Sequence, residues 1–126
     1  MSREDLSYLS AAELAALIRS RQVSPVEIMR ATLARIEGVQ PVLNVFITVC
    51  ADQAMAASRE AESALMRGDP LGPLHGVPFS VKDLVNTRGV RTTFGAVPYK
   101  DNVPDHDAVA VARMQHPVQL PSITFA

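Results

Sequence analysis

The sequence has no tryptophan, a single cysteine and few aromatic residues, which make up 5% of its 126 residues. One cysteine, Cys50, excludes a disulfide within the chain and is typical of proteins from a reducing compartment. Excess charge is also absent, because 12 Lys and Arg face 13 Asp and Glu. A chain so nearly neutral has no strong attraction for polyanions. We therefore predict no direct binding to nucleic acid.

Long apolar runs are missing as well. No stretch approaches the ~20 apolar residues that span a membrane, so we expect no membrane association. The opening residues, from Met1 to Asp5, carry charges of both signs, unlike a secretory signal peptide. These features predict a cytoplasmic protein. Apolar residues still form 48% of the chain, enough for a core of one domain or part of one.

Two helix starts carry the same sequence signal, the capping box of a serine followed three residues later by a glutamate. Ser10 and Glu13 predict a helix that runs to about residue 20. Ser24 and Glu27 predict a second helix, which we expect to end at about residue 37, before Gly38. Apolar residues recur every three or four positions in both segments, so each helix has one buried face.

The next two segments predict a strand and a third helix. Residues 43–50 are rich in β-branched and aromatic side chains, which favours a strand buried on both faces. Cys50 would be a small apolar filler at its end. Residues 51–67 are rich in alanine and end at Gly68, as a helix does. Because alanine allows close approach, we expect this helix to lie across a sheet.

Residues 77–84 alternate between two sides, which predicts a further strand after a loop rich in glycine and proline. Lys82 shares one side with Ser80 and Leu84, whereas Asp83 falls on the side of the valines. A lysine, with an ordinary pKa of ~10.4, accepts a proton only where burial lowers that value. The pattern alone favours a solvated lysine on an edge strand over a catalytic one.

Other polar residues have simpler structural interpretations. His75, in the loop before this strand, could act as a base, but a histidine bonded to the backbone is the simpler hypothesis. Asp105, His106 and Asp107 suggest a metal site, yet carboxylates at a helix start more naturally cap exposed N–H groups. The hydroxyls of residues 92–93 fit a turn. No Walker loop, dinucleotide fingerprint or zinc spacing is present, and we predict neither metal nor cofactor.

Three segments together carry a resemblance to a known family. They are the run Gly-Pro-Leu-His-Gly-Val-Pro-Phe-Ser-Val-Lys-Asp-Leu at residues 72–84, Thr-Thr-Phe-Gly at residues 92–95, and Pro-Asp-His-Asp-Ala-Val at residues 104–109. They resemble the N-terminal part of the amidase signature family of amide hydrolases, over about residues 6–114. The resemblance implies an α/β fold in which N-terminal helices pack on part of a mixed β-sheet.

The resemblance also implies a mechanism, the Ser-cisSer-Lys triad. In this family a lysine acts as the base through a serine in a cis peptide, which deprotonates a nucleophilic serine. The resemblance assigns this base to Lys82 and so reverses the simpler interpretation of that residue. It implies a small-molecule amide as substrate, no metal and no cofactor.

The chain departs from the family after Lys82. The two serines of the family lie in a Gly/Ser-rich segment well downstream, whereas Ser122 is the sole serine after Ser80 and has no glycine beside it. Helical periodicity also ends at about Gln115. We therefore divide the chain into residues 1–114, the amidase-like part, and a tail of residues 115–126, interpreted as a truncation or a change of reading frame. We expect no amidase activity from the chain alone.

Two alternative functions are consistent with the same residues. One is a small interaction module whose sheet edge pairs with another chain, either as a homo-oligomer or with a partner subunit. The other is the amidase subunit of a tRNA-dependent amidotransferase, which belongs to the same family.

The interpretation of the tail makes a prediction at the level of the gene. The nucleotide sequence after the codon for Met114, translated in all three frames, should contain a Gly/Ser-rich segment in another frame. Its absence from every frame would contradict a change of reading frame.

Overall fold

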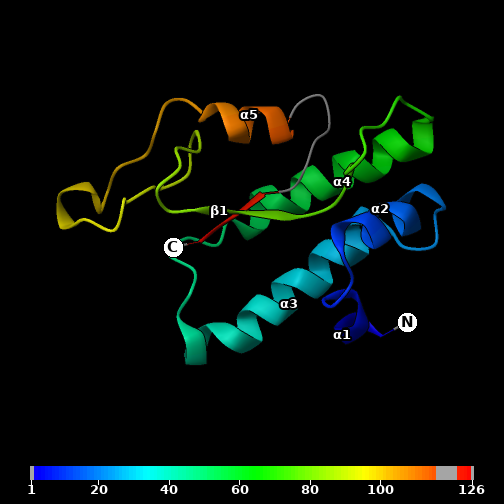
Figure 1. The fold of residues 1–126 in the computed structure, drawn as a ribbon, viewed down its shortest axis with the longest axis horizontal. Helices are drawn as coiled ribbons and strands as arrows, with labels where there is room; N and C mark the ends of the chain where they lie inside the picture. The colour runs from blue at the N-terminus through cyan, green and yellow to red at the C-terminus, as the bar shows by residue number, and fades with distance from the viewer. Residues whose placement is uncertain (1, 116–121, 126) are drawn as a thin grey trace.

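The computed structural model describes residues 2–115 and 122–125. Figure 1 shows β1 between α5 on one side and α3 on the other. The elements, in chain order, are α1 (Arg3–Leu6), α2 (Ala11–Arg19), α3 (Pro25–Leu43), α4 (Ala51–Arg67), β1 (Phe79–Lys82), the 3₁₀ turn η1 (Val97–Tyr99), α5 (Val109–Gln115) and β2 (Ser122–Phe125). None of the helices in this part of the chain has the length and apolar character needed to cross a membrane.

Both predicted capping boxes are confirmed. At the start of α2, the Glu13 N–H donates to Ser10 Oγ at 3.2 Å, and the Glu13 carboxylate accepts the Ser10 N–H at 2.8 Å. Ser24 and Glu27 repeat this exchange at the start of α3. The hydrogen bonds from the Ser10 backbone and hydroxyl hold the pKa of Glu13 below its ordinary value.

The predicted end of the second helix is wrong, because α3 continues past Glu37 and through Pro41 to Leu43. Pro41 removes a single backbone donor from the helix. The last turn closes with the Asn44 N–H, which donates to the Gln40 carbonyl at 2.8 Å, and the Gln40 side chain binds the segment that follows. Its amide nitrogen donates to the Phe46 carbonyl at 2.8 Å, and its oxygen accepts the Phe46 N–H at 3.0 Å. A side-chain contact across six residues therefore overrides the local breaking signals.

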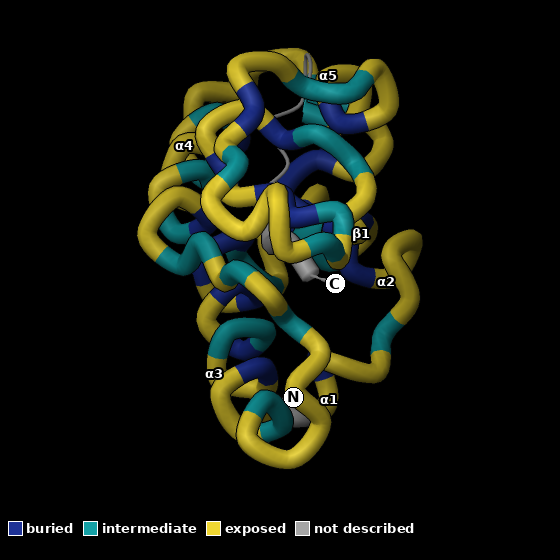
Figure 2. Tube along the Cα trace, turned by 90° about the vertical axis from the view of Figure 1, so that its left-hand side faces the viewer, coloured by how far each residue is buried: buried dark blue, intermediate teal, exposed yellow. Residues whose placement is uncertain are grey.

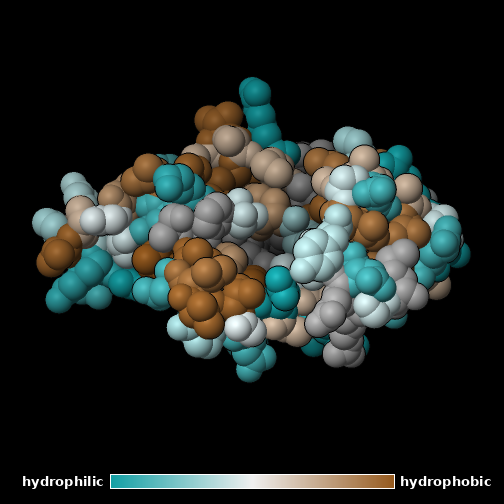
Figure 3. Space-filling view, turned by 60° about the horizontal axis from the view of Figure 1, so that its bottom comes forward, coloured by the Kyte–Doolittle hydropathy of each residue, from teal (hydrophilic) through white to brown (hydrophobic). Residues whose placement is uncertain are grey.

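The predicted strand at residues 43–50 is also wrong. Residues 44–50 are irregular, and the side chains of Val45, Ile47 and Val49 are 38%, 41% and 40% exposed. Figure 3 shows apolar side chains gathered over part of the surface of the molecule. β-Branched residues form a strand only where a neighbouring strand pairs with them, and among the described residues β1 pairs with β2 alone. Cys50 is half-buried just before α4 rather than at a strand end.

The core lies where α2, α3, α4 and the loop before β1 meet. Figure 2 shows the outward sides of the helices exposed, with buried segments towards the middle of the molecule. The main cluster of the core contains Leu6, Leu14, Ala15, Ile18, Ile28, Ala31, Leu65 and Val77. A smaller cluster joins Met29 and Ile36 of α3 to Ala54 of α4. The alanine-rich α4 packs on α3 and also contacts β2, so it lies across a sheet as expected and across a helix as well.

The strand that carries Lys82 is confirmed, although it is shorter than the predicted segment. β1 pairs in parallel with β2, with Phe79 opposite Ser122 and Lys82 opposite Phe125. Its alternation is as predicted, because Val81 is buried and Ser80 and Lys82 are exposed. The described residues thus fit an α/β fold. Most of the predicted tail, residues 116–121 and 126, lies outside the described residues.

Gly76 occupies a place in this fold that no larger residue fits. Its φ of 77° is in the left-handed region, and a Cβ there would lie 2.7 Å from Pro25 Cγ and 3.2 Å from Ile18 Cδ1. The loop before β1 therefore touches the first turn of α3 directly.

We predict that Gly76→Ala lowers the free energy of unfolding by about 2–4 kcal/mol, from the left-handed backbone and the contact with Pro25 together. Gly89→Ala is the matched control, because Gly89 has a φ of 73° but no atom within 4 Å of the added Cβ. It should cost about 1 kcal/mol. Urea unfolding of both variants measures the difference, and equal losses would contradict the role of the contact.

Candidate functional site

Lys82 ends β1 and points to the solvent side of the strand. It is exposed, as are Ser80 before it and Leu84 after it. The Lys82 carbonyl accepts the N–H of Val85 at 2.9 Å, which closes a turn immediately after the strand. The burial that would lower the pKa of a lysine is therefore not seen at Lys82 in this chain. The structure therefore presents the lysine at a surface, on a backbone fixed by the turn.

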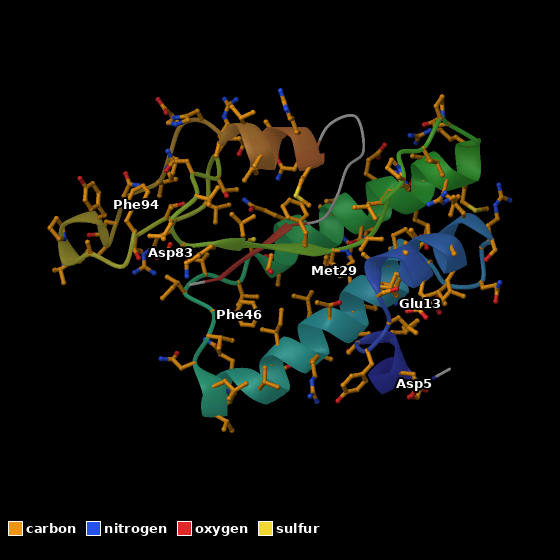
Figure 4. All side chains as sticks on the ribbon, viewed as in Figure 1. Asp5, Glu13, Met29, Phe46, Asp83 and Phe94 are labelled. Carbon is orange, nitrogen blue, oxygen red and sulfur yellow. The ribbon has the colours of Figure 1, made fainter. Side chains whose placement is uncertain are left out.

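Asp83, the next residue, points the opposite way and is 3% exposed. Its Oδ1 accepts the N–H of Thr93 at 2.8 Å, and its Oδ2 accepts the Thr93 hydroxyl. Its backbone carbonyl accepts the N–H of Phe94 at 2.9 Å. Figure 4 shows Asp83 and Phe94 together at the end of β1. We call the contact between residue 83 and residues 93–94 the Asp83–Thr93 clasp.

The importance of Asp83 was missed at the level of sequence, although a signal was present. The alternation in residues 77–84 put Asp83 on the side of the buried valines. A carboxylate on an apolar face must be hydrogen-bonded, because an unpaired buried charge is strongly destabilising. The pattern could therefore have predicted a donor for Asp83, but it could not identify Thr93.

The loop that contains Thr93 is held by hydrogen bonds of its own. The Thr92 hydroxyl donates to the Val90 carbonyl at 3.0 Å. The Thr92 N–H donates to the Asn102 carbonyl at 2.9 Å, and the Asn102 side chain donates back to the Thr92 carbonyl at 2.9 Å. The Phe94 ring meets Tyr99 edge to face, with centroids 5.2 Å apart. The hydroxyls of residues 92–93 therefore stabilise a turn, as the sequence suggested.

His75 has the structural role that its sequence context favoured. It is 6% exposed, and its Nε2 lies 2.7 Å from the carbonyl oxygen of Ala61 in α4. Because a carbonyl only accepts, Nε2 carries the proton and donates it. His75 thus joins the loop before β1 to α4.

The side chains of residues 105–107 are not gathered into a cluster of metal ligands. Within the described ranges, no three His, Cys, Asp or Glu side chains lie close enough to hold a metal ion. His106 Nδ1 lies 2.8 Å from the Asp105 carboxylate, and this hydrogen bond is the main cause that lowers the pKa of Asp105. Asp107 accepts the backbone N–H of Arg88 at 2.7 Å. Asp107 therefore caps a loop N–H, whereas α5 begins only at Val109.

Comparison with known proteins gives consistent results. The family model described as Amidase matches residues 27–117. An acylamidase from Rhodococcus erythropolis is 39% identical over 91% of this chain and 24% of its own length. A glutamyl-tRNA(Gln) amidotransferase subunit from Acidothermus cellulolyticus is 42% identical over 88% of this chain and 22% of its own.

Solved structures have the same fold over this region. A bacterial aryl acylamidase of the amidase signature enzymes superposes with a TM-score of 0.84 at 29% identity, over 94% of this chain and 25% of that one. A fatty acid amide hydrolase superposes with a TM-score of 0.86 at 26% identity, over 98% of this chain and 21% of that one. The chain therefore spans about a quarter of the length of the proteins that it matches.

The hydrogen bond of His75 leads to a stability prediction. His75→Phe keeps an aromatic ring but removes the donor to Ala61, which should lower the free energy of unfolding by about 1–2 kcal/mol. His106→Phe is the control, because the His106 side chain is 66% exposed, and it should change stability by less than about 0.5 kcal/mol. Chemical denaturation compares the two, and a His75 variant as stable as the His106 variant would contradict the assignment.

Proposed function

The chain belongs to the amidase signature family, and we propose that it is the segment of an amidase domain that supplies the catalytic base, Lys82. The observation that carries this proposal is the position of Lys82. It ends β1 on the exposed side, within the Gly-Val-Pro-Phe-Ser-Val-Lys-Asp run at residues 76–83, inside the region that the family model matches. The backbone after it is held by the turn to Val85 and by the hydrogen bonds of Asp83.

The reaction that this placement supports is hydrolysis of a carboxamide C–N bond. Lys82, in its uncharged form, accepts a proton from a bridging serine, which takes the proton of a nucleophilic serine as that oxygen attacks the amide carbon. The amine leaves with a proton, and water then releases the acid from the acyl-serine. Burial in an apolar site favours the uncharged form of a lysine. Because Lys82 is exposed in the described structure, the covering groups must come from outside it.

The described residues supply no serine placed for this role. Ser122 lies opposite Phe79 in the strand register, three residues before the position opposite Lys82. At ~3.3 Å per residue, that is about 10 Å along the strand. Ser80 is nearer in sequence, but it lies on the same strand as Lys82. The chain alone is therefore expected to have no amidase activity.

A second candidate is the amidase component of a tRNA-dependent amidotransferase. The identity of 42% to a glutamyl-tRNA(Gln) amidotransferase subunit favours it, and the identity of 39% to an acylamidase favours a stand-alone enzyme about equally. Both belong to the same family, so the proposed role of Lys82 holds for either. The two candidates differ in substrate and in the need for partner subunits.

The test is a full-length chimera, in which residues 2–115 of this chain replace the matching segment of the Rhodococcus erythropolis acylamidase. We predict that the chimera hydrolyses an aryl amide and that Lys82→Ala lowers kcat by at least about 100-fold, the contribution of a general base. Lys100→Ala is the control, because Lys100 is the other lysine in the chain and is also exposed.

The control should keep kcat within about twofold of the unchanged chimera. Activity that survives Lys82→Ala would show that Lys82 is not the base. The 126-residue chain, assayed alone with the same amide, should show no turnover. Turnover that is blocked by a serine reagent and lost in Lys82→Ala would show that the chain contains its own nucleophile.

A further inference from the structure

We propose that Asp83 is a positioning residue, which holds the backbone of Lys82 in place for proton transfer by clasping Thr93. This inference rests on the proposed role of Lys82. It concerns a residue that points away from the reacting groups and acts only through the chain.

Residue 83 is held through its side chain and its backbone. Both carboxylate oxygens of Asp83 are bound to one residue, Thr93, through its N–H and its hydroxyl. The carbonyl of the same residue is bound to Phe94. With 3% exposure, the carboxylate has almost no water to replace these donors. Residue 83 therefore cannot rotate or shift without leaving a buried charge unpaired, which is strongly unfavourable.

The partner loop has a defined shape of its own. The Thr93 hydroxyl, which donates to Asp83, also accepts the N–H of Gly95 at 3.3 Å. The Thr93 carbonyl accepts the N–H of Ala96 at 3.0 Å. Phe94 and Gly95 have φ values of 54° and 67°, a tight left-handed bend. The clasp thus ties the end of β1 to a loop that is stabilised by its own hydrogen bonds.

The strand transmits this anchor to Lys82. Adjacent residues on a strand point to opposite faces, so fixing Asp83 inside also fixes the direction in which Lys82 leaves the surface. The Lys82 carbonyl is also held, because it accepts the N–H of Val85. Proton transfer depends steeply on placement, and a shift of about 1 Å can lower a rate about 100-fold. Loss of the clasp should therefore lower kcat more than it changes KM.

The test compares two neighbouring threonines. Thr93→Val removes the hydroxyl that binds Asp83 and keeps the backbone N–H and the shape. Thr92→Val is the matched control, because Thr92 is also buried and its hydroxyl also donates to a carbonyl oxygen, that of the Val90 backbone. Thr92→Val loses one buried hydrogen bond, whereas Thr93→Val loses the bond to Asp83 and the 3.3 Å bond from the Gly95 N–H. Only Thr93→Val changes a contact of Asp83. Thr93→Ser restores the hydroxyl.

In the active chimera, we expect Thr93→Val to lower kcat about tenfold with KM within about twofold. Thr92→Val should leave kcat within about twofold, and Thr93→Ser should restore it. In the 126-residue chain, the backbone NMR shifts of Lys82 should move in Thr93→Val and return to their original values in Thr93→Ser. If Thr93→Val does not fold, Asp83→Asn, which keeps an acceptor for the Thr93 N–H, should give the same split between kcat and KM.

Equal losses of kcat in Thr92→Val and Thr93→Val, or Lys82 shifts that do not move, would overturn the positioning role. Failure of the proposed function has a different signature. In that case the chimera is inactive, or its activity persists in the Lys82→Ala variant, whatever the result for the threonine variants. The NMR shifts of Lys82 then still show whether the clasp holds its backbone.

Discussion

The structure depends on a buried carboxylate that must be paired. Asp83 has almost no contact with water, and residues 93–94 provide the donors that satisfy it. The chain between them must therefore fold back onto the end of β1. Two further backbone hydrogen bonds keep it there, from Gly89 to Pro104 at 3.0 Å and from Ala108 to Asn86 at 2.8 Å. The loops after the strand are thus organised around one charge.

This arrangement separates support from chemistry on the two sides of a short strand. The buried side carries Val77, Val81 and the clasp, and Lys82 is exposed on the other side. His75, next to the same strand, belongs to the support because it binds α4. Because the chain belongs to the amidase signature family, we assign a catalytic role to Lys82 on the exposed side. The chain spans about a quarter of the length of the relatives that it matches. Lys82 is the part of the family's triad that we assign to this quarter.

The predictions that failed have one cause. Residues 43–50 have the composition of a strand, and Pro41 is an ordinary sign that a helix has ended. Both signals are weak preferences that tertiary contacts override. No strand within the described residues pairs with residues 43–50, and the Gln40 side chain binds Phe46 beyond the proline. The helix therefore extends, and the segment after it stays irregular and partly exposed.

The sequence by itself determined the features that act over a few residues. These are the two capping boxes, the helix that ends at Gly68, the alternation around Lys82 and the motif that identifies the family. Only the tertiary structure decided which groups meet across longer separations. Asp83 meets Thr93 ten residues away, and His75 meets Ala61 fourteen residues away. Local signals depend on bonds within one turn or one pleat, whereas these partners depend on the path of the whole chain.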